Sequence, residues 1–357
     1  MRRRSRVAKG AGIFGAAVGV AAAGLATAFA VERALVRRSV NAPGDPYVEE
    51  PFGDQPFDRE LTVTAADGTD LHVEIIEPES ASDDPTIVFV HGFALDMGTF
   101  YFQRKALAER GTHRMVFYDQ PGHGKSGKLQ SGSYDLAALG RSLAAVLEET
   151  TVPGERIILV GHSMGGMTIM AFAEQFPAWF GNRVTGVVLM STSAGLFDKA
   201  KLGLTNVVAR ASAPFIPLWS KAAQLGGGTI DRARVASSDL AWLLTRRYGF
   251  GEPKPSPSLV TFVESMNSKT SAETLTRYLQ TLYTHNRIPA LSALRGVPVL
   301  VVVGERDYLT PVTHSEQIIE NLPEAELLKV ENSGHVVMLE KADQVNAALI
   351  PFLEKLT

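Results

Sequence analysis

The residues best suited to chemistry are a serine, an aspartate and a histidine that each follow a predicted strand. Ser163 is the centre of a G-x-S-x-G sequence, between an aliphatic run at residues 156–161 and a helical pattern at residues 167–173. A strand-turn-helix context of this kind exposes the serine as a nucleophile. Because a Ser hydroxyl is a poor nucleophile at neutral pH, it needs a base in contact and a group that orients the base. His335 and Asp307 are the candidates for those two functions.

The residues beside Ser163 favour the same interpretation. Gly161 and Gly165 permit a sharp turn in which larger side chains would collide with the neighbouring strand and helix. A serine just before a helix also directs a backbone N–H, that of Met164, at an oxyanion forming on the acyl carbon. The sequence therefore predicts acyl transfer chemistry at Ser163.

Other polar residues offer alternatives for the acid and the base. The acid could instead be Glu305 or Asp198, of which Asp198 follows the predicted strand at residues 184–190. No other histidine fits the position of the base as well. His162 is expected to pack in the turn, and no chemistry is assigned to the remaining candidates, which are His91, His123, His285 and His314.

The elements that must position these residues alternate along the chain. A hairpin is expected over residues 60–64 and 70–76, and continuous apolar runs predict strands buried on both faces. These runs are residues 86–90, 114–118, 156–161, 184–190, 297–303 and 325–330, with helical patterns at 100–110, 134–150, 314–321 and 342–353. Strands that alternate with helices predict an α/β fold, with a mostly parallel, doubly wound sheet and the site at the carboxyl ends of its strands.

The alternation is interrupted at residues 195–289, which predict a mainly helical cap inserted into a core formed by residues 58–194 and 290–357. Helical patterns occur near residues 239–248 and 271–285. Aromatic cap residues, namely Phe215, Trp219 and Trp242, are candidates to line an apolar acyl pocket, although such residues also form ordinary core.

Taken together, these motifs resemble the α/β-hydrolase fold family over residues 58–355. The resemblance rests on His91-Gly92, the loop at residues 119–126, the elbow of Ser163, Gly-x-x-Asp-x-x-x-x-Pro around Asp307, and Ser-Gly-His at residues 333–335. It implies that Ser163 attacks an acyl carbon, that His335 shuttles the proton and that Asp307 fixes the histidine tautomer. It also implies an oxyanion hole formed by the N–H groups of Phe93 and Met164, with no metal and no organic cofactor.

The activity expected within this family is hydrolysis of carboxylic esters. Related epoxide hydrolases and dehalogenases use Asp at the elbow, so Ser163 disfavours both. The form Gly-His-Ser-Met-Gly-Gly resembles esterases and monoacylglycerol-type lipases, and we expect a small-molecule ester with a medium apolar acyl group as substrate. A C–C bond hydrolase, a perhydrolase and a non-catalytic ligand-binding member of the fold are the alternatives.

The N-terminal region predicts attachment to a membrane. Five Arg and Lys residues precede residues 11–30, a run of 20 residues without a charge that as a helix is long enough to cross a bilayer of about 30 Å. Either it is an uncleaved signal anchor with the catalytic domain outside the cytoplasm, or it is a signal peptide that is cleaved near Ala30 and the protein is secreted. The Pro-rich, acidic residues 41–57 then predict an extended linker that tethers the core to the membrane.

Composition excludes several classes of function. Residues 1–40 hold eight of the 35 basic residues and one of the 38 acidic residues, which leaves 27 basic and 37 acidic residues and a net charge of −10 on the rest of the chain. An acidic body argues against a nucleic acid partner. With zero cysteines, disulfides, thiolate metal sites and a cysteine nucleophile are excluded.

Overall fold

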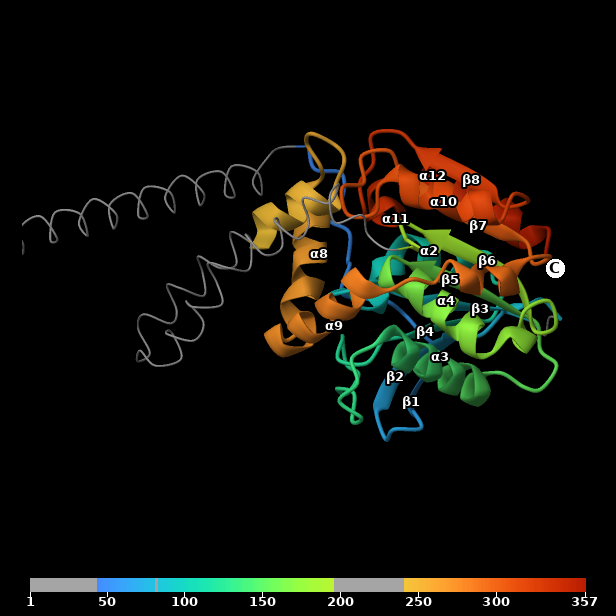
Figure 1. Ribbon diagram of the computed structural model, residues 1–357. Helices are drawn as coiled ribbons and strands as arrows, with labels where there is room; N and C mark the ends of the chain where they lie inside the picture. Colours follow the sequence, from blue (N-terminus) through green and yellow to red (C-terminus); the bar gives the residue numbers. More distant parts are fainter. Residues whose placement is uncertain (1–43, 81–82, 196–240) are drawn as a thin grey trace, which may run out of the picture.

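A computed structural model describes residues 44–80, 83–195 and 241–357 (Figure 1). The predicted membrane segment at residues 11–30, the cap candidates Phe215 and Trp219, and the alternative acid Asp198 lie outside these described residues. Within the described ranges, no helix has both the length and the apolar character needed to cross a membrane.

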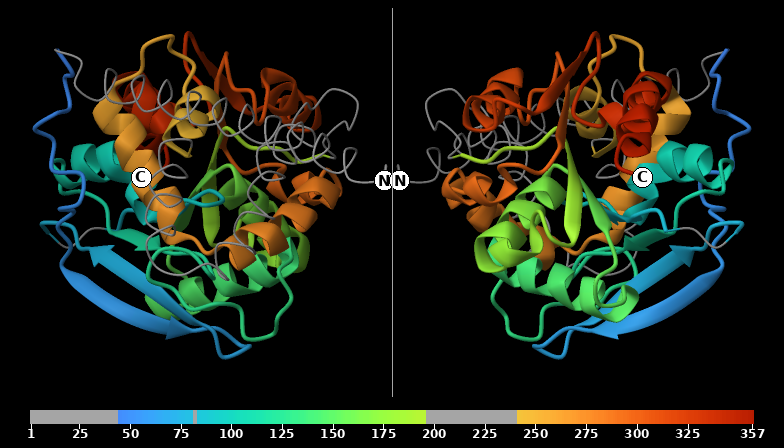
Figure 2. Two further views of the ribbon diagram at one scale, coloured as in Figure 1. Left: turned by 90° about the vertical axis from the view of Figure 1, so that its left-hand side faces the viewer. Right: turned by 90° about the vertical axis from the view of Figure 1, so that its right-hand side faces the viewer.

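The core is an eight-stranded sheet with the strand order β1-β2-β4-β3-β5-β6-β7-β8. Only the pairs β1–β2 and β2–β4 are antiparallel, and the hairpin of β1 and β2 lies at the edge away from β7 and β8 (Figure 2). The mostly parallel sheet predicted from the sequence is therefore confirmed. The strands are β1 (Arg59–Thr64), β2 (Asp70–Ile76), β3 (Thr86–Val90), β4 (Met115–Tyr118), β5 (Ile157–His162), β6 (Val184–Met190), β7 (Val299–Gly304) and β8 (Glu326–Val330).

Helices cover both faces of the sheet because consecutive strand residues point to opposite sides. Ile87 and Phe89 of β3 pack in one apolar cluster with residues of α2 (Tyr101–Ala108) and α12 (Ala342–Glu354). Val88 and Val90 pack in a second cluster with residues of α3 (Leu136–Thr150), α4 (Met164–Gln175) and α10 (Val312–Asn321). Short helical segments complete the core, namely η1 (Met97–Phe100), η2 (Pro177–Trp179), η3 (Pro289–Leu294) and α11 (Val337–Glu340).

Three further helical segments belong to the predicted cap. They are residues 241–249, α8 (Pro257–Lys269) and α9 (Ala272–Thr284), and α8 and α9 lie on the side of the molecule opposite the C-terminus (Figure 1). The sequence patterns indicated the first and the third but missed α8. Its start signal is present, since Ser256 accepts a hydrogen bond from the Leu259 N–H and Pro257 occupies the first turn. The boundaries of the cap at residues 195 and 289 remain predictions.

Residues 44–57 pack against the body instead of standing off it as an extended tether. The ring of Phe52 stacks on Phe262 of α8 with 4.5 Å between centroids and 13° between planes. Asp45 accepts hydrogen bonds from the Ser256 hydroxyl and the Ser258 N–H at the start of α8, and Arg104 donates to the carbonyl of Pro56. The prolines and acids of this segment favour an extended chain, but its aromatic side chains gain stability by leaving water, and this burial decides its position.

Candidate active site

The turn that carries Ser163 is strained and closely packed. Ser163 has φ 52° and ψ −117°, a left-handed conformation that few residues other than glycine adopt, between the end of β5 and the start of α4. A Cβ on Gly165 would lie 1.9 Å from the Val90 carbonyl oxygen, and one on Gly161 would lie 2.7 Å from the Gly166 nitrogen. The predicted need for small residues on both sides of the turn is therefore borne out by the packing.

Three strand ends bring the serine, the histidine and the aspartate together. Ser163 follows β5, Asp307 follows β7 and His335 follows β8. His335 Nε2 lies 2.9 Å from Ser163 Oγ, and His335 Nδ1 lies 2.9 Å from Asp307 Oδ2. All three residues are buried, with 9% of Ser163, 7% of His335 and 3% of Asp307 exposed. Burial shields these hydrogen bonds from competition by water.

The surroundings of Asp307 determine which nitrogen of His335 carries the proton. Oδ1 of Asp307 accepts from the backbone N–H groups of Leu309 and Thr310, and Oδ2 accepts from the Thr310 hydroxyl at 2.8 Å. Since the carboxylate accepts and the Thr310 proton is already donated to it, Nδ1 of His335 must donate to Asp307. Nε2 is then free to accept the proton of Ser163, which is the arrangement that general base catalysis requires.

The backbone N–H groups of Phe93 and Met164 lie beside Ser163. Neither has an acceptor among the residues that the structure describes. Phe93 follows Gly92, whose Cβ, if present, would lie 3.2 Å from Ser163 Cβ. Met164 is the first residue of α4, where a helical N–H has no partner within the helix. Both groups can therefore donate to an oxyanion that forms next to Ser163.

The alternative acids and bases are arranged differently. Glu305 is exposed, with its backbone N–H bonded to Val330, and His314 Nδ1 lies 2.6 Å from the Ser193 hydroxyl. His162 is fully buried, and its Nε2 lies 3.0 Å from the carbonyl oxygen of His335. Burial, and secondarily the charge of His335, lowers the pKa of His162 well below its ordinary value. His162 is thus a neutral donor that supports the His335 loop.

Trp242 lies in the described part of the predicted cap, and only 5% of it is exposed. Its indole N–H donates to the Thr261 hydroxyl at 3.0 Å, and its ring packs in the cluster that contains Phe89 and Phe250. This is the environment of a core residue, and a function for Trp242 in an acyl pocket remains a prediction.

Glu340 is a positioning residue that the sequence reasoning missed. Its carboxylate accepts hydrogen bonds from the N–H groups of Gly251 and Glu252, from the N–H of Gly334 at 2.6 Å and from the Ser333 hydroxyl. It therefore ties a loop of the predicted cap, between residues 249 and 257, to the residue directly before His335. The available signal was a carboxylate directly after the apolar residues Val337, Met338 and Leu339, close to the histidine motif.

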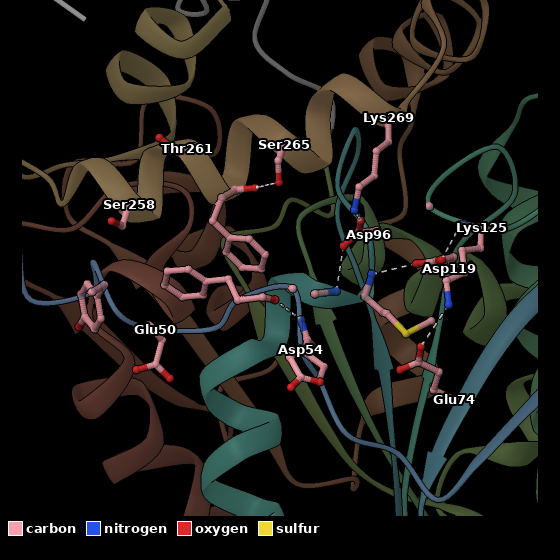
Figure 3. Close-up of a pocket in the computed structure, with 18 of the residues that line it drawn as sticks. Glu50, Asp54, Glu74, Asp96, Asp119, Lys125, Ser258, Thr261, Ser265 and Lys269 are labelled. Carbon is pink, nitrogen blue, oxygen red and sulfur yellow. Dashed lines mark hydrogen bonds and ion pairs between the residues drawn. The ribbon is translucent and has the colours of Figure 1, made fainter. Parts of the chain in front are cut away.

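A cavity of about 870 Å³ lies between residues 47–57, α8 and the edge of the sheet, away from Ser163, Asp307 and His335. Its lining includes carboxylates that pair with a lysine or accept from backbone N–H groups. Lys269 of α8 reaches Asp96 at 2.8 Å, and Asp119 accepts from the backbone N–H groups of Met97 and Lys125 (Figure 3). In the described ranges, no three His, Asp or Glu side chains gather in a way that could hold a metal ion.

The fold and the site define the class of the protein. The chain belongs to the alpha/beta hydrolase fold family, with residues 85–342 matching that family, so the resemblance found in the motifs is confirmed. It is 31% identical over 271 residues to the dihydrolipoyllysine-residue acetyltransferase component of an acetoin cleaving system from Pseudomonas putida, covering 75% of this chain but only 63% of that relative.

Two solved structures have the same fold. A thermophilic esterase from Thermogutta terrifontis matches with a TM-score of 0.65 at 22% identity, covering 84% of this chain and 99% of that one. An esterase from Exiguobacterium antarcticum matches with a TM-score of 0.65 at 20% identity, covering 83% of this chain and 100% of that one. Both are similar to this chain in fold.

Because His123 is buried, we expect the protein to lose stability in acid. Burial, and secondarily the neighbouring His91, lowers the pKa of His123 from 6.5 to about 3. As the pH falls, His123 binds a proton near its ordinary pKa of 6.5 in the unfolded chain, but only near 3 in the folded chain. The stability contributed by neutral His123 is therefore present above pH 6.5 and is lost as the pH falls toward 3. In His123→Leu, the decline in unfolding free energy from about pH 6.5 to about pH 4.5 should be smaller by about 2 kcal/mol.

Urea unfolding followed by tryptophan fluorescence at several pH values measures this difference. The comparison uses the change with pH in each protein, so any constant destabilisation by the substitution cancels. Parallel curves for the wild type and His123→Leu would contradict the prediction.

Proposed function

We propose that this protein is a serine hydrolase that cleaves carboxylic esters of apolar acyl groups through an acyl-enzyme. The observation that supports this most strongly is the buried hydrogen-bonded chain from Asp307 through His335 to Ser163, with 2.9 Å for each of the two contacts of the histidine. The two N–H groups of Phe93 and Met164 beside the serine complete the requirements of acyl transfer.

In the proposed reaction, Ser163 Oγ attacks the acyl carbon while its proton passes to His335 Nε2. The negative charge on the former carbonyl oxygen is stabilised by the N–H groups of Phe93 and Met164. The bond from the acyl carbon to the alkoxy oxygen then breaks, and His335 returns the proton to the departing alcohol. Water, deprotonated by His335, attacks the acyl-enzyme in the same way and releases the carboxylic acid, with Asp307 stabilising the imidazolium in both halves.

The choice of an ester rests on three kinds of support. The nucleophile is a serine, which suits acyl carbons, whereas related epoxide hydrolases and dehalogenases use an aspartate. The two solved structures named above are esterases. The aromatic residues of the predicted cap suit an apolar acyl group. A C–C bond hydrolase or a perhydrolase would use the same three residues and is the alternative.

We further propose that residues 11–30 anchor the protein in a membrane with the catalytic domain outside the cytoplasm, the alternative being secretion after cleavage. The support is the 20-residue uncharged run and the basic residues that precede it. Anchored protein should stay in the membrane pellet after alkaline carbonate extraction and dissolve only in detergent. Recovery from the medium as a chain that begins near residue 31 would instead establish cleavage.

The ester hypothesis is tested by hydrolysis of p-nitrophenyl esters of increasing acyl length, with the full chain in detergent. We expect activity to peak at one apolar chain length, and Ser163→Ala to lower kcat by about 10⁴-fold or more because the nucleophile is absent. Ser315→Ala is the matched control, since Ser315 is also buried and its hydroxyl has no partner among the described residues.

Equal, very low rates for the wild type and Ser163→Ala on every ester would contradict the proposal. A wild type that is inert on esters but cleaves a carbon–carbon bond next to a carbonyl group, in a Ser163-dependent way, would favour the alternative.

A further inference from the structure

Gln120 lies between the two segments that carry the free N–H groups of the site. It follows β4, two residues after Tyr118, and is fully buried. Its side-chain Nε2 donates to the carbonyl oxygen of His91 at 2.5 Å, and its Oε1 accepts from the Thr168 hydroxyl at 2.8 Å. One amide group therefore connects the loop after β3 to the first turns of α4.

On the side of the loop, Gln120 makes two contacts with His91. Besides the side-chain bond, the backbone N–H of Gln120 donates to His91 Nε2 at 2.8 Å. Since Nε2 accepts a proton, Nδ1 must carry the proton of the neutral ring, and it donates to the Gly92 carbonyl at 2.8 Å. Burial lowers the pKa of His91, which agrees with a neutral ring. Residues 91 and 92 are thus held directly before Phe93.

On the side of the helix, the contact is made through Thr168. Thr168 is fully buried and lies one helical turn after Met164. Its hydroxyl is within reach of both Gln120 Oε1, at 2.8 Å, and the Met164 carbonyl oxygen, at 2.9 Å. The hydroxyl has one proton, and the amide oxygen of Gln120 accepts no other hydrogen bond from the described side chains, so donation to Gln120 satisfies a buried acceptor.

We propose that Gln120 is a positioning residue that sets the spacing between the N–H groups of Phe93 and Met164. This inference rests on the proposed function, because the spacing matters only if an oxyanion forms between those groups. The bridge needs a side chain that donates on one side and accepts on the other, and the carboxamide of glutamine does both. A carboxylate would keep the size but lose the donor to His91.

The effect of the bridge should appear in the transition state and not in substrate binding. The two N–H groups act on the oxygen only after it becomes an oxyanion, and donors placed even slightly wrongly stabilise it less. Removing one donor of such a pair outright lowers kcat by about 10²- to 10³-fold, so loss of a residue that only positions the pair should cost less.

The experiment compares four variants of the full chain on the best ester substrate. Gln120→Glu and Thr168→Val break the bridge from opposite sides, and each should lower kcat about 10- to 100-fold with KM changed less than about threefold. Thr168→Ser keeps the hydroxyl and should restore most of the activity lost in Thr168→Val. Thr99→Val removes a buried hydroxyl that has no partner among the described residues and serves as the control.

A trifluoromethyl ketone with the same acyl chain gives an independent readout, because its adduct with Ser163 carries an oxyanion. Its affinity should fall by the same factor as kcat/KM in Gln120→Glu and Thr168→Val. The double variant should be no slower than the slower single variant, since both substitutions break one bridge.

The outcomes are distinguishable. If the bridge variants melt at lower temperature but their folded fraction keeps the kcat and inhibitor affinity of the wild type, Gln120 only stabilises the fold and the inference is wrong. If the wild type itself hydrolyses no ester, the proposed function fails and the inference fails with it.

Discussion

The close approach of α4 to the end of β3 is the constraint on which the site depends. The first turn of α4 lies so near β3 that a Cβ on Gly165 would stand 1.9 Å from the Val90 carbonyl oxygen. This approach forces Ser163 into a left-handed conformation with φ 52°, and the cost of about 1–3 kcal/mol for such a residue must be offset by the surrounding packing. The result is a serine that faces the site from the start of a helix, next to the loop after β3.

The parallel sheet supplies the rest of the geometry. Because β5, β7 and β8 run in the same direction, the residues that follow them emerge at one edge of the sheet. The hydrogen bonds of Asp307 with Leu309 and Thr310, and those of Glu340 with Gly334, then fix the two loops that end at the site. Asp307 and Thr310 are buried, so an unpaired polar atom there would be costly and these hydrogen bonds hold the loop in place.

Local sequence patterns were sufficient to predict the strands, and to predict that Ser163, Asp307 and His335 lie at one edge of the sheet. Continuous apolar runs such as residues 86–90 predict buried strands, and residues at strand ends follow from the topology. Long-range contacts were not predictable in this way. The packing of Phe52 on Phe262 and the bridge from Gln120 to His91 and Thr168 join residues far apart in the chain, and neither leaves a periodic or motif signal. The start of α8 was missed because its cap signal lies in a Pro-rich stretch.

The most direct test of the central claim is to find where the acyl group is attached during turnover. The full chain is mixed with a slowly deacylated ester, quenched in acid, digested and examined by mass spectrometry. We expect one peptide to gain the mass of the acyl group minus a hydrogen, with the modification on Ser163, and none in Ser163→Ala. Ester turnover with no acylated peptide under conditions where the acyl-enzyme should accumulate, or with the acyl group on another residue, would contradict the account.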